Sequence, residues 1–464
     1  MENFWDFNVW GGFVVVAVLL ISLLVAHALK KNIHFLQASL IPTSVLGGAI
    51  LLIISSVYKV FSGTNLFDAP IFGGNGTALL EIITYHSLAL GFVASVFKSA
   101  HNKFTRERNR EIFNTGVTTV STYLLQGIVG LAITMVTATI VTGFFPAAGV
   151  LLPFGYGQGT GQALNYGGIY EMQFGFEGGK SFGLTIAALG FLSASIGGVI
   201  HLNILKKRGF IAMKRQEEGA ISSEEIQGGN EIPMQESLDK MTVQVAIVAV
   251  AYLLAYLAMF AIGKALPGMK SVVYGFNFLL GVLMATLIKG ILNLLHKKGV
   301  VQKNYTNSFL MTRISNFFFD IMVVAGIAAI RLSILKKYWG IMLILGVVGL
   351  VITYFYNHFV AKKLFPGYVE EQFLAMFGML TGTASTGVVL LREIDGDLRT
   401  PVAENLVYQN FPAMVFGFPM MLLATLAPVK PLTVLLILIG FFAVMNVILF
   451  RSFIFKKKKT PAKV

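Results

Sequence analysis

The sequence predicts an all-α polytopic membrane protein. Of the 464 residues, 55% are apolar and only 12% are charged, whereas charged residues make up about 25% of a typical soluble domain. The mean hydropathy is +0.74, and apolar stretches of about 20 residues, the length that spans a bilayer, recur along the chain. This composition excludes a soluble enzyme, a disordered chain and a nucleic-acid-binding protein. The absence of Cys excludes disulfides, thiol catalysis and thiolate metal ligands.

Eleven apolar stretches have a length suited to crossing the membrane. Five of them precede a long polar segment in the middle of the chain, at residues 9–29, 40–60, 83–97, 116–142 and 182–205. Six follow it, at residues 243–262, 271–295, 315–335, 338–360, 403–426 and 431–450. We therefore expect eleven transmembrane helices, of which the third is the shortest.

The basic residues indicate how these helices are oriented. Glu2 and Asp6 lie near the N-terminus and no Lys or Arg precedes Lys30, unlike a cleavable signal peptide, so we place the N-terminus outside the cytoplasm. Alternating spans then put 28 of the 36 basic residues on the inside and 8 outside. This asymmetry predicts a multi-pass protein of the bacterial inner membrane with a cytoplasmic C-terminus. The lysines at 456–459 are expected to contact anionic lipid.

The polar segment divides the chain into four parts. We predict a first five-span repeat at 1–205, a cytoplasmic linker without a core at 206–241, a second five-span repeat at 242–426, and an extra span with a basic tail at 427–464. Because five is odd, the second repeat must be inverted relative to the first.

Two sequence landmarks recur at nearly the same offset. Ile41-Pro42 near the second span and Leu266-Pro267 before the seventh are 225 residues apart, and Gly161 and Gly387 are 226 apart. These matching offsets favour a duplication.

Two segments at corresponding positions are apolar but broken by residues that interrupt helices. The first contains Pro146, Pro153 and six glycines from 155 to 168, and the middle of the second is composed of Gly, Thr, Ala and Ser. Irregular backbone at membrane depth must be buried in protein or line a cavity, and paired interrupted segments indicate a transporter's binding site. We therefore predict re-entrant hairpins near 144–167 and near 370–395, with tips that meet near the midplane.

The first tip has the sequence Gly155-Tyr-Gly-Gln-Gly-Thr-Gly-Gln162. Glycines let successive N–H groups converge on an anion, and a helix N-terminus adds to this effect. Neutral donors suit a substrate carboxylate, and the residues assigned to it here are Gly157, Gln158, Gly159, Thr160, Gly161 and Gln162. The alternative is a glycine-rich turn that only permits close packing.

The second tip carries hydroxyl groups at Thr381, Thr383, Ser385 and Thr386. Hydroxyls and unwound carbonyls are hard oxygen ligands that suit Na⁺, so Thr381, Thr383 and Ser385 are predicted Na⁺ ligands. Thr383, Ser385 and Thr386 are also predicted to contact the substrate. The alternative is that the hydroxyls bond back to carbonyls of their own helix.

Three further polar residues near these segments have two readings each. Asp320 and Asn316 lie one turn apart in the eighth span. They are predicted either to bind Na⁺ or H⁺, or to form a salt bridge or helix cap near the inner face. Arg392 follows the second tip and either pairs with a substrate carboxylate or neutralises Glu393 or Asp395.

Other polar residues in apolar spans, His86, Gln126 and His201, are expected to make packing hydrogen bonds. No His and Glu residues have zinc-site spacing, and the sequence has no Walker motif and no paired nucleophile and base. We therefore expect no enzyme and no ATP-driven pump, and an ion gradient would supply the driving force.

The chain resembles the bacterial sodium:glutamate symporter family. The resemblance rests on Ile41-Pro-Thr-Ser-Val-Leu-Gly-Gly48, Gly155-x-Gly-x-Gly-Thr-Gly161, Leu189-Gly-Phe-x₅-Gly197-Gly198 and the glycine- and threonine-rich residues 381–387. It implies five-span inverted repeats with re-entrant loops, a homodimer, and elevator-like movement of a transport domain against a scaffold. It also implies Na⁺-coupled uptake of L-glutamate. Family members carry His where Gln158 stands.

The sequence therefore predicts a Na⁺-coupled symporter of L-glutamate or a related small anion, with no organic cofactor. The alternatives are a di- or tricarboxylate symporter on the same scaffold, an ion:proton antiporter in which Asp320 carries the proton, and a channel or scaffold protein without coupled transport.

Overall fold

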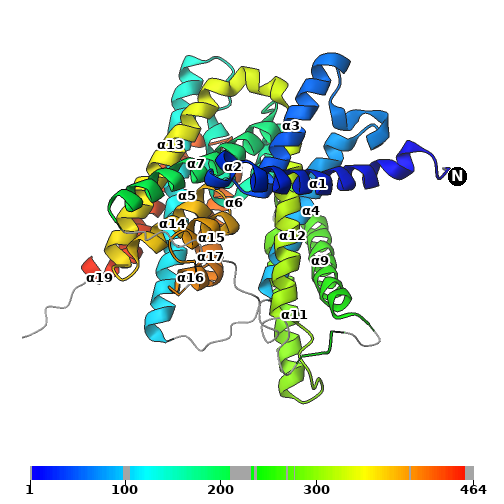
Figure 1. Ribbon diagram of the computed structural model, residues 1–464. Coiled ribbons are helices and arrows are strands. Elements are labelled where there is room, and N and C mark those ends of the chain that lie inside the picture. The colour runs from blue at the N-terminus through cyan, green and yellow to red at the C-terminus, as the bar shows by residue number, and fades with distance from the viewer. Residues whose placement is uncertain are drawn as a thin grey trace, which may run out of the picture. The chain divides into compact units, whose positions relative to one another are not determined.

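The computed structural model describes residues 3–97, 105–209, 231–234, 238–267, 270–275, 277–396 and 399–454. Within these ranges the ordered elements are helices, and the β-structure consists of one isolated bridge between Glu231 and Asn304 (Figure 1). Most of the predicted linker and the lysines at 456–459 lie outside the described residues.

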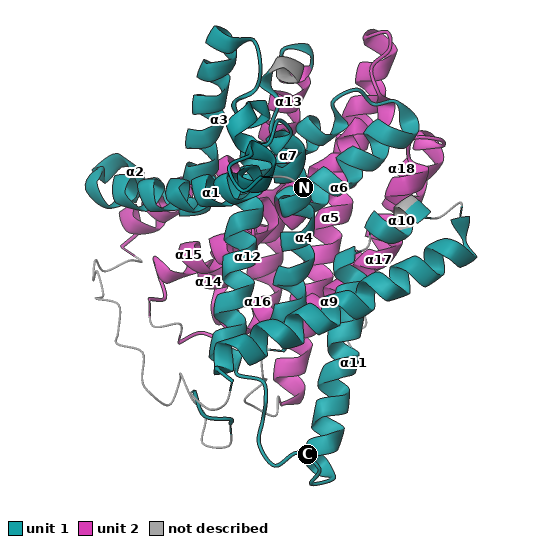
Figure 2. Cartoon of the chain, turned by 90° about the vertical axis from the view of Figure 1, so that its right-hand side faces the viewer, with its two compact units in different colours: residues 1–103, 160–188, 212–337 teal, residues 104–159, 189–211, 338–464 magenta. Residues whose placement is uncertain are grey.

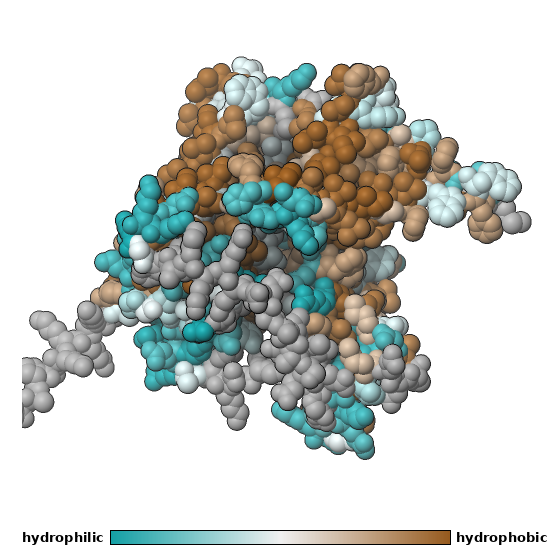
Figure 3. Space-filling view, viewed as in Figure 1, coloured by the Kyte–Doolittle hydropathy of each residue, from teal (hydrophilic) through white to brown (hydrophobic). Residues whose placement is uncertain are grey.

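Ten of the described helices are long and apolar enough to cross a membrane, and a bent pair of helices makes up to eleven. Each of the eleven predicted spans coincides with one of them. Many large apolar side chains are exposed, including Phe13, Leu24 and Phe61, and Figure 3 shows apolar side chains over much of the face in view. These observations confirm the predicted class, a helical protein with multiple transmembrane segments.

The bent pair replaces the predicted span at 403–426. It consists of α16 (Val402–Tyr408) and α17 (Asn410–Leu426), which meet at 47°. Pro412 explains the break, because a continuous helix would require an N–H that proline lacks, whereas the first turn of α17 does not.

The described chain forms two compact units, shown in teal and magenta in Figure 2. Unit 1 comprises Met1–Lys103, Thr160–Ala188 and Ala212–Lys337, and unit 2 comprises Phe104–Gly159, Leu189–Ile211 and Tyr338–Val464. Each unit therefore contains helices from both sides of the linker.

Unit 1 holds the first three predicted spans of each half of the sequence. Its long helices are α1 (Phe7–Asn32), α3 (Thr43–Ser62), α4 (Gly76–Val96), α9 (Lys240–Ala265), α11 (Asn277–Lys297) and α12 (Ser308–Ala328). Its short elements are α2 (His34–Ala38), η1 (Leu66–Asp68), η2 (Pro70–Phe72) and α10 (Lys270–Gly275).

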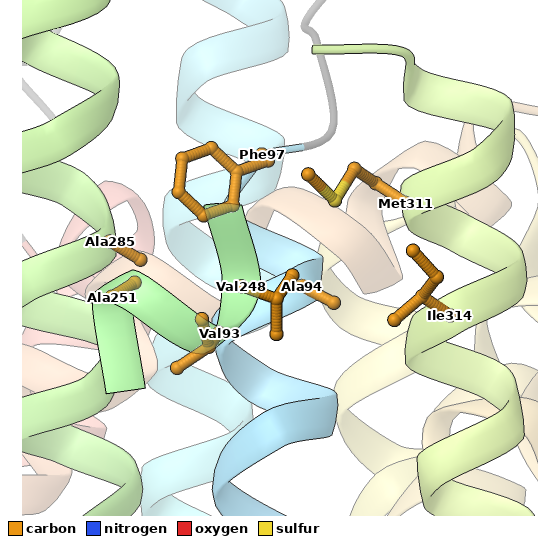
Figure 4. Packing of buried hydrophobic residues seen from close by; sticks show 8 residues of the cluster. All are labelled: Val93, Ala94, Phe97, Val248, Ala251, Ala285, Met311 and Ile314. Carbon is orange, nitrogen blue, oxygen red and sulfur yellow. The ribbon is translucent and has the colours of Figure 1, made fainter. Parts of the chain in front are cut away.

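The centre of unit 1 is apolar. Helix α4 packs against α12, where the Ser315 hydroxyl donates to Gly91 O at 2.9 Å and the rings of Phe92 and Phe319 meet edge to face at 5.3 Å. A buried cluster joins α4 to α9, α11 and α12 and consists of Val93, Ala94, Phe97, Val248, Ala251, Ala285, Met311 and Ile314 (Figure 4). Because lipid is as apolar as these side chains, the cluster stabilises unit 1 through van der Waals packing between the helices.

Unit 2 holds the later spans of each half. Its elements are α5 (Arg106–Ile140), η3 (Pro146–Val150), most of α13 (Leu332–Leu364), α14 (Val369–Thr381), α15 (Ala384–Arg392), α16, α17, α18 (Pro431–Leu449) and α19 (Arg451–Ile454). Two further helices, α6 (Leu151–Phe174) and α7 (Gly179–Lys207), contribute residues to both units.

Candidate functional site

The first glycine-rich motif interrupts α6 at Gly159. This residue has φ 79° and ψ −170°, a conformation that glycine adopts far more readily than any residue with a Cβ. The chain passes from unit 2 to unit 1 directly after it, between Gly159 and Thr160. The predicted irregular backbone is therefore present within the motif.

Helix α6 is broken without turning back on itself. In unit 1, a Cβ on Gly183 would lie 2.3 Å from Ala163 O, and a Cβ on Gly167 would lie 2.3 Å from Gly179 O. In unit 2, Tyr156 donates or accepts a 2.8 Å hydrogen bond with Ser193. Both arms of α6 thus run antiparallel to α7, because small residues allow the two backbones to approach closely. The hairpin predicted near 144–167 stays a prediction, and within this range the structure shows a helix interrupted at Gly159.

Most groups of the first motif are engaged in packing. A Cβ on Gly157 would lie 2.0 Å from the Tyr123 ring, and one on Gly161 would lie 2.8 Å from Leu88. The Thr160 hydroxyl is buried and donates to Met322 O at 3.2 Å. For these residues the close-packing alternative accounts for the observed contacts, and Gln158 is half-buried.

Gln162 differs from its neighbours. Its side chain is 1% exposed, and neither Oε1 nor Nε2 has a hydrogen-bond partner. A buried amide without partners costs about 1–3 kcal/mol. Gln162 is therefore the residue of the first motif that is available to a polar ligand.

The second motif forms a helical hairpin. Helices α14 and α15 are joined at Gly382 and Thr383, and a Cβ on Gly378 would lie 2.8 Å from Gly387 Cα. A Cβ on Gly387 would lie 2.4 Å from Ala375 O. The arms are therefore held together by glycines that let two backbones touch.

The hydroxyl groups at this tip are used in three ways. Thr381 donates to Phe377 O at 2.6 Å within its own helix, as the structural alternative predicted. Thr383 caps α15, and its Oγ1 accepts from Thr386 N at 3.4 Å. Ser385 is exposed in the first turn of α15. First-turn N–H groups have no partner inside a helix, so this end of α15 presents donors and a positive dipole.

The other residues predicted to bind Na⁺ or substrate lie outside the second tip. Asp320 and Asn316 belong to unit 1, where the Ser44 hydroxyl in the first turn of α3 hydrogen-bonds to the exposed Asp320 carboxylate. This is a contact between two side chains and not a helix cap, because the start of α3 has no side-chain cap hydrogen bond, so the role of Asp320 stays a prediction. Arg392 is exposed at the end of α15, whereas Asp395 accepts hydrogen bonds from Thr400 Oγ1 and Arg399 N at 2.6 and 2.8 Å.

Helix α5 binds a backbone carbonyl of each motif. The Tyr123 hydroxyl donates to Gly157 O at 2.9 Å, and one turn later Gln126 Nε2 donates to Leu380 O at 3.0 Å. Both contacts lie within unit 2. From the sequence, Gln126 was expected to make a packing hydrogen bond, with lining of the site as the less favoured alternative, and Tyr123 gave no signal.

Glycine residues of α7 complete this arrangement in unit 2. A Cβ on Gly190 would lie 2.6 Å from Thr381 O and 3.1 Å from the Tyr156 ring, so both motifs reach the same point of α7. Gly197 and Gly198 similarly admit Phe377 and Leu390 of the hairpin. The Leu189–Gly198 stretch of the sequence therefore serves as the surface on which the two motifs converge.

The crossing of α5 and α13 next to Leu380 contains unpaired oxygens. Gln126 Nε2 donates to Thr353 Oγ1 at 2.8 Å, and Asn357 Nδ2 donates to Thr353 O at 2.9 Å and to Thr122 Oγ1 at 3.4 Å. Gln126 Oε1 and Asn357 Oδ1 are buried without a donor. Amide groups with satisfied donors and bare acceptors suit a cation rather than an anion.

Thr353 and Asn357 were missed in the sequence. They stand four residues apart in Thr353-Tyr-Phe-Tyr-Asn357 and therefore lie on one helix face, a pattern that would have suggested a polar stripe on α13.

Sequence searches add no relative to this picture, because the chain matches no protein-family model and no curated protein.

Proposed function

We propose that the chain is a secondary active transporter that couples uptake of an anionic amino acid, L-glutamate in the first instance, to Na⁺. The observation that carries this proposal is the convergence of two interrupted helices in unit 2. Tyr123 and Gln126 bind carbonyls of the two motifs, and Gly190 lies against both of them. Paired interrupted helices indicate a substrate site in transporters, and a structural scaffold has no need of them.

The bare oxygens at the α5–α13 crossing support Na⁺ as the coupling ion. Gln126 Oε1 and Asn357 Oδ1 are buried acceptors without a donor, and the Gln126 amide also binds Leu380 O, in the last turn before the second tip. Bound Na⁺ would offset the cost of burying them and would fix the end of α14. This differs from the ligand set drawn from the sequence, since it uses amide oxygens of α5 and α13 in addition to the tip.

Two features support an anionic substrate. The first turn of α15 presents N–H donors at Ala384 and Ser385, both exposed. Separately, in unit 1, Gln162 of the first motif has a buried amide without partners, which suits a polar ligand there. A carboxylate that binds such neutral donors needs no fixed counter-charge, which leaves the site electrically neutral when it is empty.

Contacts between helices support the inverted repeat. Residues that meet at the two helix crossings are separated by intervals close to the 225–226 offset of the sequence landmarks. Gly91 and Ser315 on α4 and α12 are 224 apart, and Gln126 and Thr353 on α5 and α13 are 227 apart. In a pair of repeats related by a two-fold axis, residues near the axis contact their own counterparts, as these do.

The proposed mechanism is elevator-like. The division into two compact units supplies two bodies, and unit 2 contains the α5–α13 crossing and the second hairpin. Na⁺ orders the end of α14 and thereby prepares the tip for the carboxylate, so each ligand increases the affinity for the other. The homodimer and the cell-membrane location implied by the family resemblance belong to the same proposal.

Uptake into proteoliposomes tests the proposal. We expect saturable uptake of labelled glutamate that requires an inward Na⁺ gradient and shows counterflow. Competition by malate or citrate in preference to glutamate and aspartate would assign a different carboxylate. Dissipation of a pH gradient by Na⁺ without organic solute, or flux without saturation, would overturn the symporter in favour of an antiporter or a channel.

A further inference from the structure

Three titratable side chains lie close together in unit 2, near the C-terminal end of α13. They are His201 of α7, His358 of α13 and Glu370 in the first turn of α14, and one ligand atom from each lies within 4.8 Å of the other two. His201 is 169 residues from Glu370 in sequence, which is why residue spacing did not reveal the cluster. Lys206 and Lys362 follow shortly after the two histidines.

The hydrogen bonds of these residues explain only part of the cluster. His201 Nε2 hydrogen-bonds to Glu370 Oε2 at 2.8 Å. His358 Nδ1, in contrast, is buried and has no partner. A buried ring nitrogen without a partner is costly, so the His201–Glu370 pair alone does not account for the presence of His358.

The rings are held in place by their surroundings. His201 Nδ1 makes a 2.7 Å hydrogen bond with the Tyr354 hydroxyl, which orients the ring and leaves Nε2 facing the cluster. The Phe373 ring packs at 4.4 Å from the His201 ring and 4.9 Å from the His358 ring. Hydrogen bonds from the second ring nitrogen are the usual means by which proteins orient histidine ligands of metals.

We propose that His201, His358 and Glu370 bind a divalent transition-metal ion of the Zn²⁺ class. Two imidazoles and one carboxylate form a common three-ligand set for this ion, with water in the fourth position. With metal–ligand bonds of about 2 Å, each ligand atom would have to move toward the centre by less than about 1 Å. The ion would replace the His201–Glu370 hydrogen bond and would be bound by one ring nitrogen of His358.

The charges around the cluster limit the affinity. Lys362 and Arg208 lie close enough to affect His358 electrostatically, and Glu370 supplies the compensating negative charge. The chain has no Cys to provide a thiolate. We therefore expect an exchangeable site, weaker than a structural zinc site.

A bound ion would tie the first turn of α14 to α7 and α13. Helix α14 leads directly to Leu380 and Thr381, so the ion would restrain the arm that carries the second tip. We therefore expect Zn²⁺ to inhibit uptake. This expectation rests on the proposed transport function, whereas the proposal that the three residues bind metal does not depend on that function.

Metal binding is measured on the purified full-length protein in detergent, with Co²⁺ as the spectroscopic probe and Zn²⁺ as its competitor. We expect one Co²⁺ per chain with the visible absorption of a low-coordinate site, displaced by Zn²⁺ and unaffected by Mg²⁺. His358→Gln and Glu370→Gln should each weaken Co²⁺ binding at least tenfold. Thermal scans of both metal-free variants check that each remains folded, because Phe373 packs against His358 and His201 hydrogen-bonds to Glu370.

His86→Gln provides the matched control. His86 is an exposed histidine of α4 that hydrogen-bonds to Tyr252 at 2.7 Å, and the cluster of His201, His358 and Glu370 does not include it. This variant should bind Co²⁺ like the unmodified protein. Absence of Co²⁺ binding, or binding that persists in both His358→Gln and Glu370→Gln, would overturn the metal-site proposal. Neither result would bear on the transport proposal, which Na⁺-driven uptake tests separately.

Discussion

Two helix crossings in this chain are built alike and filled differently. The α4–α12 crossing in unit 1 is lined by Phe92, Phe319 and a buried apolar cluster. The α5–α13 crossing in unit 2 is lined by Gln126, Thr353 and Asn357. Both join residues separated by nearly the same interval in sequence.

The difference indicates how stability and function are divided. Apolar contacts stabilise the first crossing and leave nothing for a ligand to bind. The second crossing leaves two amide oxygens without donors, a cost that a protein sustains where a ligand offsets it. Substitutions at and around the polar crossing can therefore distinguish a binding site from a polar form of packing.

The largest effect is expected for Gly190→Ala. A Cβ at this position would lie 2.6 Å from Thr381 O, and a backbone oxygen cannot move aside as the end of a flexible side chain can. Overpacking of this kind costs about 1–3 kcal/mol, and uptake should be abolished as the two motifs are forced apart. Thermal unfolding and uptake assays measure both.

Gly440→Ala is the control for Gly190→Ala. Gly440 lies in α18, and a Cβ added there would meet open space, so the substitution should be neutral or stabilise the helix by about 0.5–1 kcal/mol. If Gly190→Ala behaves like Gly440→Ala, the convergence of the motifs on α7 does not matter for transport.

Asn357→Leu should lower the apparent affinity for Na⁺ by about tenfold or more, the range seen when metal sites lose a supporting group. The variant removes the bare Oδ1, the 2.9 Å hydrogen bond to Thr353 O within α13 and a weak contact to Thr122 at 3.4 Å. Unchanged Na⁺ dependence of glutamate uptake would show that the bare oxygens serve packing, as those of an ordinary polar crossing would.

Gln162→Met and Gln244→Met should change stability in opposite directions. Gln162 makes no hydrogen bonds, so an apolar side chain of similar shape should stabilise the ligand-free protein by about 1 kcal/mol and weaken substrate-induced stabilisation. Gln244 is equally buried, but it donates to Tyr305 O at 2.8 Å and accepts from Asn307 N at 2.9 Å.

Loss of the Gln244 amide should therefore destabilise unit 1 by about 1–3 kcal/mol, since it leaves buried partners unpaired. Thermal unfolding with and without glutamate separates the two cases. Equal losses in both variants would mean that Gln162 is an ordinary structural amide.

The smallest effect concerns pH. The hydrogen bond from His201 holds the pKa of Glu370 below its ordinary value of 4.5. A lowered pKa in the folded protein contributes stability that is present above 4.5 and is lost as the pH falls through the folded-state pKa. Glu370→Gln should therefore unfold with a weaker pH dependence below about 4.5, as measured by thermal scans between about pH 3 and pH 6. An identical pH profile would contradict the pair.

The sequence by itself determined the membrane class, the spans and the two interrupted segments. These features depend on composition and local order, because hydrophobic length decides whether a segment crosses a bilayer and Gly or Pro decides where a helix breaks. Gly159 and Gly382–Thr383 break helices where the residue types predicted.

Only the tertiary structure decided how those breaks are used. Both arms of α6 found partners along the glycines of α7, so the first break became a kink, whereas α14 and α15 found each other across Gly378 and Gly387 and formed a hairpin. Gln126, Asn357 and the histidine cluster depend on contacts between helices more than 150 residues apart in sequence. Such contacts follow from packing in three dimensions, and the residue pattern along one helix does not predict them.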